Sequence, residues 1–139
     1  MTEIKKEKWL VCGTHFTRLD TSLLNNYRNK VFEFLDKALR DNRAIYGADW
    51  KPECIIEGEC PNSADVFAKE WAEKNGVAVK PFPAENGGHL RRNIEMVNEN
   101  PSDVFAYWNG FSYGSAFTIA RAVAKGIPVT IIKIGSNYV

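Results

Sequence analysis

Residues that could bind an anion follow an apolar run in the last third of the chain. The run is Val104–Trp108. It ends at Asn109-Gly110, and Gly114-Ser115 then leads into apolar residues at helical spacing through Ala124. This order predicts a strand, a glycine-bearing loop and the start of a helix. Free backbone N–H groups and the positive end of a helix dipole favour an anion there. We therefore expect Asn109, Gly110, Gly114 and Ser115 to contact the phosphate of a nucleotide-type ligand. The alternative is a turn that needs glycine for its backbone alone.

Two aromatic residues lie in the same loop. Phe111 and Tyr113 are candidates for stacking on a base, because an aromatic side chain in a loop has less reason to be buried than one in a strand. Trp108 and Phe82 are expected in the core instead.

Two earlier loops also follow apolar runs and carry polar side chains. Gly13, Thr14 and His15 follow the first run, and Gly58 to Asp65 follow the second. Thr14 is a candidate hydrogen-bond partner of a ligand. His15 could contact phosphate or act as an acid or base, because its charge changes near neutral pH. Asp65 could accept hydrogen bonds from ribose or a base. The alternatives are an exposed loop histidine and an aspartate favoured by a helix dipole.

A short predicted helix from His89 to Asn98 carries a further pair of candidates. Arg92 could bind phosphate oxygens in a bidentate manner, and its alternative is a surface arginine. Asn93 either contacts the ligand or fixes the geometry of the loop. The apolar spacing predicts that Leu90, Ile94 and Val97 face the core.

Apolar periodicity predicts nine elements that alternate between strand and helix. The strands are expected at 9–13, 54–58, 77–82, 104–108 and 127–132, and the helices at 21–40, 64–74, 89–98 and 116–124. Pro81 predicts an edge strand or a strand end. Residues 41–52 are expected to form a loop that could cover a pocket. Strict alternation predicts an α/β fold, with helices on both faces of a parallel sheet. The loops after the strands would then meet at the ligand-binding edge.

Length, charge and cysteine content limit the class of protein. The 139 residues predict one domain over 1–139, with a charged lead-in at 1–8 and a tail at 135–139. A formal net charge of +1 makes a nucleic-acid partner unexpected, and the absence of a long apolar run makes a membrane partner unexpected. Three cysteines without a secretion signal favour free thiols in a cytoplasmic protein. Their spacing fits no zinc pattern, so we expect no metal and no cofactor.

Four pieces of the chain resemble the SLOG superfamily, and within it the small single-domain proteins called YspA-like. Val11 to His15 is similar to the family's strand ending in Gly-Ser-Arg, with Thr14 and His15 as replacements. Glu57 to Asp65 is similar to a glycine-containing turn ending in Ala-Asp. Arg92 to Met96 matches Arg-Asn-x-x-Met. Trp108 to Ser115 is similar to the Gly-Gly-x-Gly-Thr loop, with Ser115 for threonine. The resemblance runs from about Trp9 to Lys133.

The resemblance implies a three-layer Rossmann-like sandwich with strand order 3-2-1-4-5 and a nucleotide-type ligand. LOG phosphoribohydrolases are related proteins that cleave an N-glycosidic bond with a glutamate, and the matching position here is Thr118. A sensor or sequestering protein is therefore the expected function. Similar small proteins are frequent in bacteriophage genomes, where one possibility is capture of a host nucleotide signal. Relatives commonly assemble, which implies a homo-oligomer.

Two other functions stay open. One is hydrolysis or transfer at an N-glycosidic bond by a displaced acid or base, for which the candidates are Asp65, Glu95 and His15, with Glu59 and Glu85 as further carboxylates. The other is association with DNA, by analogy with the related DprA domain. The near-neutral net charge counts against the DNA reading.

Overall fold

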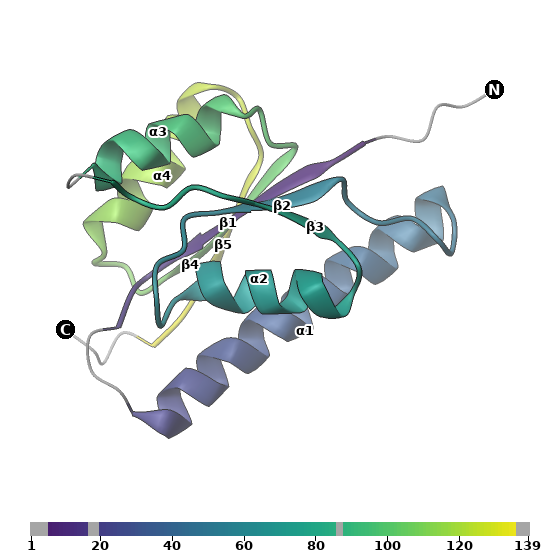
Figure 1. Cartoon of the computed structure of the whole chain (residues 1–139), viewed down its shortest axis with the longest axis horizontal. Coiled ribbons are helices and arrows are strands. Elements are labelled where there is room, and N and C mark those ends of the chain that lie inside the picture. Colours follow the sequence, from purple (N-terminus) through teal and green to yellow (C-terminus); the bar gives the residue numbers. More distant parts are fainter. Residues whose placement is uncertain (1–5, 17–19, 86–87, 136–139) are drawn as a thin grey trace.

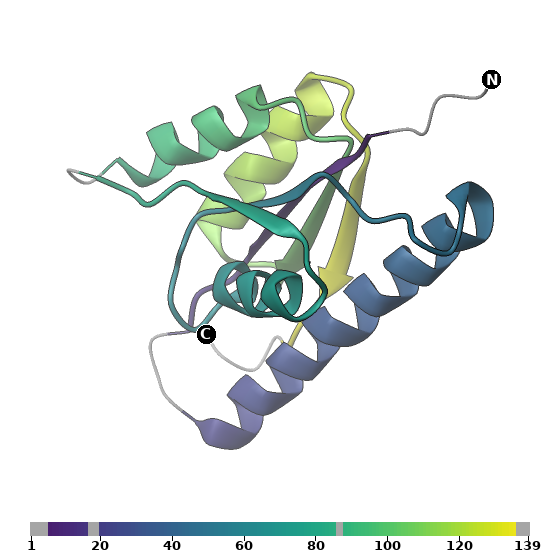
Figure 2. The same cartoon turned by 45° about the vertical axis from the view of Figure 1, so that its right-hand side comes forward.

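A computed structural model describes residues 6–16, 20–85 and 88–135, and it contains a parallel sheet between two pairs of helices (Figures 1 and 2). The strands are β1 (Lys8–Gly13), β2 (Cys54–Glu57), β3 (Ala78–Pro81), β4 (Asp103–Trp108) and β5 (Val129–Lys133). They lie in the order β3-β2-β1-β4-β5, and all neighbouring pairs are parallel. The predicted architecture and strand order are confirmed.

Helices cover both faces of this sheet. The helices α1 (Thr21–Tyr46) and α2 (Ala64–Lys74) pack side by side on one face, and α3 (His89–Asn98) and α4 (Tyr113–Ala124) do so on the other (Figure 1). Successive strand residues point to opposite faces. Trp9 and Val11 of β1 accordingly join the core under α1 and α2, whereas Leu10 and Cys12 join the core under α3 and α4. The result is the predicted three-layer sandwich.

The core under α1 and α2 is rich in aromatic rings. Trp9 lies with its ring centroid 5.4 to 6.1 Å from those of Trp50, Trp71 and Phe105. Aromatic pairs at these separations contribute roughly 0.5–1.5 kcal/mol beyond the area they bury. These contacts pack the central strands β1 and β4 against α2 and the linker after α1.

The helix α1 is longer than predicted. The predicted end at Arg40 is wrong, because the helix continues to Tyr46 and ends at Gly47, whose N–H donates to Arg43 O. The remaining linker does not cover a pocket at the carboxyl edge of the sheet. Its Trp50 is buried against Trp9 near the start of β1, at the opposite edge. The linker after α1 shows no apolar periodicity in its sequence, and it packs onto the core through the single side chain of Trp50.

Two predictions about the helices α3 and α4 also need correction. The helix α4 begins at Tyr113 rather than Ala116, so Gly114 and Ser115 form its first turn instead of a loop. Leu90 is 40% exposed, although it was expected to face the core. The buried residues of α3 are Arg92, Asn93, Met96 and Val97. Polar side chains occupy this buried face because they bind neighbouring backbone and side-chain groups.

The remaining boundaries differ by small amounts. Pro81 ends β3, which is an edge strand as the proline predicted. Lys8 belongs to β1, so the lead-in is shorter than predicted, and its first five residues lie outside the described part of the chain, as do residues 136–139 of the tail. The three cysteines are free thiols, as expected, and Cys12 and Cys54 are buried. None of the helices in the described ranges combines the length and hydrophobicity needed to cross a membrane.

Candidate functional site

A cavity of about 470 Å³ opens at the carboxyl edge of the sheet, beside the end of β1. This is where the strand order reverses between β1 and β4, the usual ligand position in open α/β sheets. The cavity, called the edge pocket below, lies between the turn after β2, the helix α3 and the first turn of α4. Eight of the predicted binding residues line it: Gly13, His15, Asp65, Arg92, Asn93, Tyr113, Gly114 and Ser115.

The end of β1 forms one side of the edge pocket. Gly13 is required by packing, because a Cβ there would collide with the Tyr27 hydroxyl and lie 2.9 Å from Ala64 Cβ. Thr14 does not line the edge pocket. Its Oγ1 accepts a hydrogen bond from Asn109 N at 3.1 Å, which joins β1 to the loop after β4. The predicted ligand contact of Thr14 is therefore replaced by a bond within the protein.

His15 lies at the rim of the edge pocket. Its Nδ1 contacts Pro61 O, and a carbonyl oxygen can only accept, so Nδ1 carries the proton. The other ring nitrogen, Nε2, is left as the acceptor of a neutral imidazole or as a second donor when the ring is charged. His15 is thus an exposed histidine whose orientation the turn after β2 fixes.

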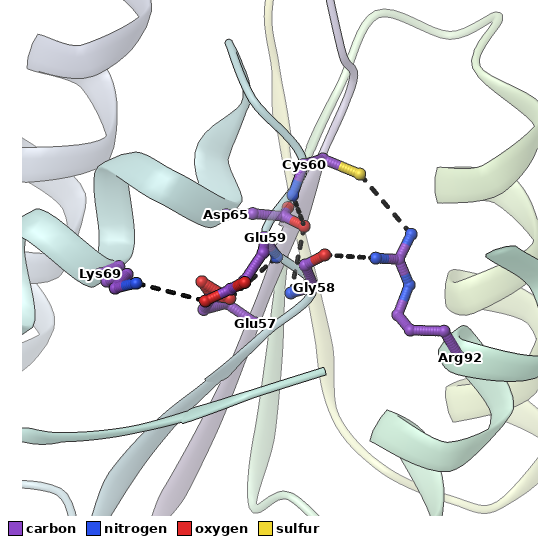
Figure 3. A network of polar contacts seen from close by, with 7 residues as sticks. All are labelled: Glu57, Gly58, Glu59, Cys60, Asp65, Lys69 and Arg92. Carbon is purple, nitrogen blue, oxygen red and sulfur yellow. Dashed lines mark hydrogen bonds and ion pairs between the residues drawn. The ribbon is translucent and has the colours of Figure 1, made fainter. Parts of the chain in front are cut away.

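The turn between β2 and α2 is held from inside by Asp65. Ser63 caps α2, and its Oγ accepts from Asp65 N at 3.2 Å. The Asp65 carboxylate points back into the turn (Figure 3), where Oδ2 accepts from Gly58 N at 3.1 Å and Cys60 N at 3.4 Å. Burial raises the pKa of Asp65, and the Arg92 guanidinium opposes that shift. The main role of Asp65 is therefore to stabilise the Gly58–Cys60 turn, which forms one wall of the edge pocket. Only the lone pairs of its carboxylate that the turn does not use can accept hydrogen bonds from a ligand.

Arg92 approaches the same turn from α3 (Figure 3). Its Nη1 donates to Gly58 O and to Phe82 O, its Nε donates to Asn93 Oδ1 at 2.7 Å, and its Nη2 contacts Cys60 Sγ at 3.6 Å. The predicted bidentate phosphate contact is therefore corrected, because most guanidinium N–H groups already have protein acceptors. Among the described residues Nη2 meets only a weak sulfur acceptor, so it can still donate to a ligand.

Gly58 does not itself line the edge pocket. A Cβ at this position would collide with the Arg92 guanidinium and lie 3.0 Å from Asp65 Oδ2. The predicted ligand contact of Gly58 is thus replaced by close packing of two charged side chains on its backbone.

The loop after β4 presents the start of α4 to the edge pocket. Asn109 is buried, and its Oδ1 accepts from Phe111 N and Ser112 N at 2.9 Å each, so it shapes the loop rather than lining the pocket. Ser112 gives α4 no side-chain cap. The N–H groups of the first turn have no intrahelical acceptors in an α-helix, and the dipole adds positive potential. An anion is favoured beside Gly114 and Ser115.

Two other predicted residues of this loop, Gly110 and Phe111, do not line the edge pocket. Gly110 has φ +90°, which glycine adopts readily, and a Cβ there would meet open space. Phe111 is 63% exposed and does not line the cavity. Tyr113 is 71% exposed at the rim, so it is the loop aromatic placed to stack on a ligand.

Carboxylates suited to catalysis are scarce at the edge pocket. Glu95 is exposed on another side of α3 and lies 3.5 Å from Arg91 Nε, so it does not reach the cavity. Glu59 and Glu85 do not line it either. Among the described lining residues Asp65 is the sole carboxylate. Thr118, at the position of the hydrolase glutamate, is buried in the wall and donates to Gly114 O at 3.1 Å.

Sequence reasoning did not identify part of the lining. The residues missed are Cys12, Cys60, Pro61, His89, Leu90, Met96 and Ser112. Cys12 and Cys60 lie within two residues of the predicted site residues Gly13 and Gly58, and this proximity in sequence could have identified them. His89 starts α3, so both histidines of the chain lie at one cavity although they are 74 positions apart. Burial raises the pKa of Cys60, so this thiol stays protonated near neutral pH.

Known structures share this fold. A universal stress protein family protein from Arabidopsis thaliana with AMP bound matches with a TM-score of 0.55 and 18% identity, over 94% of this chain and 93% of that chain. A Moco carrier protein from Chlamydomonas reinhardtii matches with a TM-score of 0.54 and 13% identity, over 92% and 76%. At these identities the likeness shows the fold alone. No protein-family model and no curated protein matches the sequence.

Proposed function

We propose that this protein binds a nucleotide or a nucleotide-derived molecule in the edge pocket and holds it without turnover, as a sensor or sequestering protein of the SLOG type. The observation that carries the proposal is the meeting of the uncapped start of α4 and the Arg92 guanidinium at one cavity of about 470 Å³. A volume in this range suits one small ligand. The Arabidopsis protein of the same fold, with AMP bound, makes AMP the first probe.

The two ends of such a ligand meet different surroundings. The phosphate lies against the N–H groups of Gly114 and Ser115, within reach of Arg92 Nη2. The ring lies at the rim, where Tyr113 supplies a stacking surface and His15 a ring nitrogen. In this arrangement the charged end is buried deepest and the aromatic end stays near solvent.

Binding is favoured over cleavage by the state of the candidate acids. Asp65 Oδ2 already accepts two backbone N–H groups, Glu95 lies outside the cavity, and Thr118 has no acidic group. A glycosidase requires two carboxyl groups or an equivalent acid and base beside the scissile bond. The described lining of the edge pocket holds one carboxyl group, that of Asp65, rather than two, and the other candidate from the sequence, His15, lies exposed at the rim.

The experiment is a ligand panel of nucleoside monophosphates, NAD, ADP-ribose and cyclic nucleotides. Thermal shift and calorimetry measure binding, and chromatography of the same samples measures released base. We expect at least one compound to raise the melting temperature and to be recovered intact. Released base would establish the hydrolase alternative instead, and the absence of any binding across the panel would refute the proposal. DNA binding would have to persist at physiological salt in a mobility shift.

A pair of variants locates the site. Gly114→Ala places a Cβ 3.8 Å from Asn93 Nδ2, an ordinary contact, so the fold tolerates it while the methyl group narrows the anion position. We expect roughly tenfold weaker binding, equivalent to about 1.4 kcal/mol. Arg91→Ala, on the solvent side of α3, is the matched control and should bind like the wild type. Equal affinity of Gly114→Ala and wild type would place the ligand elsewhere.

A further inference from the structure

A buried carboxyl group lies directly beneath the wall of the edge pocket. Glu57 is the last residue of β2 and is fully buried. Its Oε2 accepts a hydrogen bond from Glu59 N at 2.9 Å, while Oε1 has no hydrogen-bond partner among the described residues (Figure 3). A carboxylate ordinarily requires several donors when it is buried. One donor for two oxygens leaves a charged carboxylate poorly solvated, which favours the protonated form.

The charged groups around Glu57 also favour its protonated form. Asp65 on α2 adds a like charge, and so does Glu59 in the turn. Lys69 on α2 is the nearby cation, but its ammonium group lies 3.2 Å from Glu59 Oε1. The same turn also carries the thiol of Cys60 and meets the Arg92 guanidinium, which donates to Gly58 O. Burial and Asp65 together raise the pKa of Glu57 to about 7, so its proton is exchanged near neutral pH.

The turn above Glu57 stores backbone strain. Glu59 has φ 56° and Asn62 has φ 54°, and both are non-glycine residues in the left-handed region. Such residues persist only where their surroundings hold them. The turn is held by Asp65 at two N–H groups, by Arg92 at Gly58 O, and by Glu57 at Glu59 N. Cys60 and Pro61 of this turn line the edge pocket.

We propose that Glu57 is a proton-controlled positioning residue, which fixes the Gly58–Cys60 wall of the edge pocket when protonated and releases it when ionised. The neutral acid satisfies Glu59 N and needs no counterion. The ionised carboxylate has a bare Oε1 and an adjacent Asp65, so it must recruit water or Lys69. The Glu59 N–H favours the ionised carboxylate, but burial and Asp65 outweigh it, so the ionised side chain shifts toward water or Lys69. That shift alters the hydrogen bond to Glu59 N and moves Cys60. The coupling to a ligand rests on the proposed function, whereas the movement of the wall does not.

The rate at which Cys60 is alkylated reports how firmly the Gly58–Cys60 wall is held. Wild type and Glu57→Gln are treated with iodoacetamide between pH 6 and 8, and peptide mass spectrometry separates Cys60 from Cys12 and Cys54. The rate ratio of the two proteins cancels the intrinsic pH dependence of the thiol. We expect this ratio to rise at least about threefold from pH 6 to pH 8, since one unit above a pKa changes the proton occupancy up to tenfold. A ratio independent of pH overturns the proposal.

Two further variants are controls for the role of Glu57. Glu73→Gln removes an exposed carboxylate from the same helix α2 and should follow the wild type at every pH. Glu57→Met removes the ionisable group together with the acceptor for Glu59 N, so it should lack the wild-type pH dependence as Glu57→Gln does, whatever its absolute labelling rate. It also serves if the amide variant folds poorly. A Glu57→Met protein that keeps the wild-type pH dependence would assign the titration to another group and refute the role of Glu57.

The ligand arm uses AMP as the probe. We expect the dissociation constant of wild type, divided by that of Glu57→Gln, to rise over the same pH window by a similar factor. A labelling ratio that changes while AMP binds neither protein would count against the proposed AMP-type ligand and leave the proton-controlled wall in place. AMP binding with a constant labelling ratio would support the pocket and refute the role of Glu57.

Discussion

Arg92 and Asp65 bind opposite sides of one residue, Gly58. The Arg92 guanidinium donates to Gly58 O, and Gly58 N donates to Asp65 Oδ2 at 3.1 Å. The two charged side chains come from different helices, α3 and α2, on opposite faces of the sheet. The Gly58–Cys60 wall of the edge pocket therefore connects the two helical layers of the fold. Gly58 lies at its centre, where a side chain would have no room.

The space at Gly58 gives the first prediction. Gly58→Ala places a Cβ against the Arg92 guanidinium and Asp65 Oδ2. We expect a loss of roughly 1–3 kcal/mol in the free energy of unfolding, the usual cost of overpacking. Gly114→Ala is the control, because its Cβ makes an ordinary contact and removes a flexible residue from a helix, so it should be neutral or stabilising by up to about 1 kcal/mol. Urea unfolding measures both, and equal stabilities would contradict the prediction.

The two adjacent arginines of α3 should differ strongly. Arg92→Ala leaves Gly58 O and the buried Asp65 without their cation, and hydrogen bonds to charged groups contribute about 1.5–3 kcal/mol each. We expect a loss of at least about 2 kcal/mol by denaturant unfolding. Arg91 is largely exposed and has an ion pair with Glu95 one helical turn away, so Arg91→Ala should cost no more than about 0.5 kcal/mol. Similar losses would mean that the Arg92 contacts add little.

Glu57 predicts a pH dependence of stability without any ligand. Its pKa is about 7 in the folded protein and near 4.5 when exposed, so the folded state binds the proton more tightly. The stability therefore falls as the pH rises from about 4.5 to about 7 and is level above 7 for this group. The full effect is on the order of 3 kcal/mol. Glu57→Gln should remove it, so the variant gains on wild type between pH 5 and 8 in urea unfolding. A constant difference across this range would contradict the raised pKa.

Two tyrosines differ in whether their hydroxyl has a partner. Tyr27 donates to Thr14 O at 3.0 Å and accepts from Ala64 N at 2.9 Å, which joins α1 to the end of β1 and the start of α2. Tyr27→Phe leaves both buried backbone groups unpaired and should cost about 1–3 kcal/mol. The Tyr107 hydroxyl is buried with no hydrogen-bond partner in the described part of the chain, so Tyr107→Phe should be neutral or stabilising. Thermal unfolding compares the two, and the reverse order would refute this assignment.

The sequence located about half of the lining of the edge pocket because strand ends are local features. Apolar runs that stop at Gly13, near Gly58 and at Asn109 marked three loops, and parallel pairing brought them to one edge. The sequence did not predict how Arg92 is used. A surface arginine, a phosphate ligand and a buried structural cation have the same local pattern, and only its acceptors at Gly58 O and Asn93 Oδ1 distinguish them.

The sequence by itself determined the alternation of strands and helices and the strand cores, because side-chain periodicity acts over a few residues. Tertiary structure decided the rest of the site. It buried Glu57 beneath the turn, brought His15 and His89 to one cavity, and excluded Glu95 from it. These outcomes depend on packing between segments far apart in the chain, where burial and hydrogen-bond partners set both the direction and the charge of a side chain.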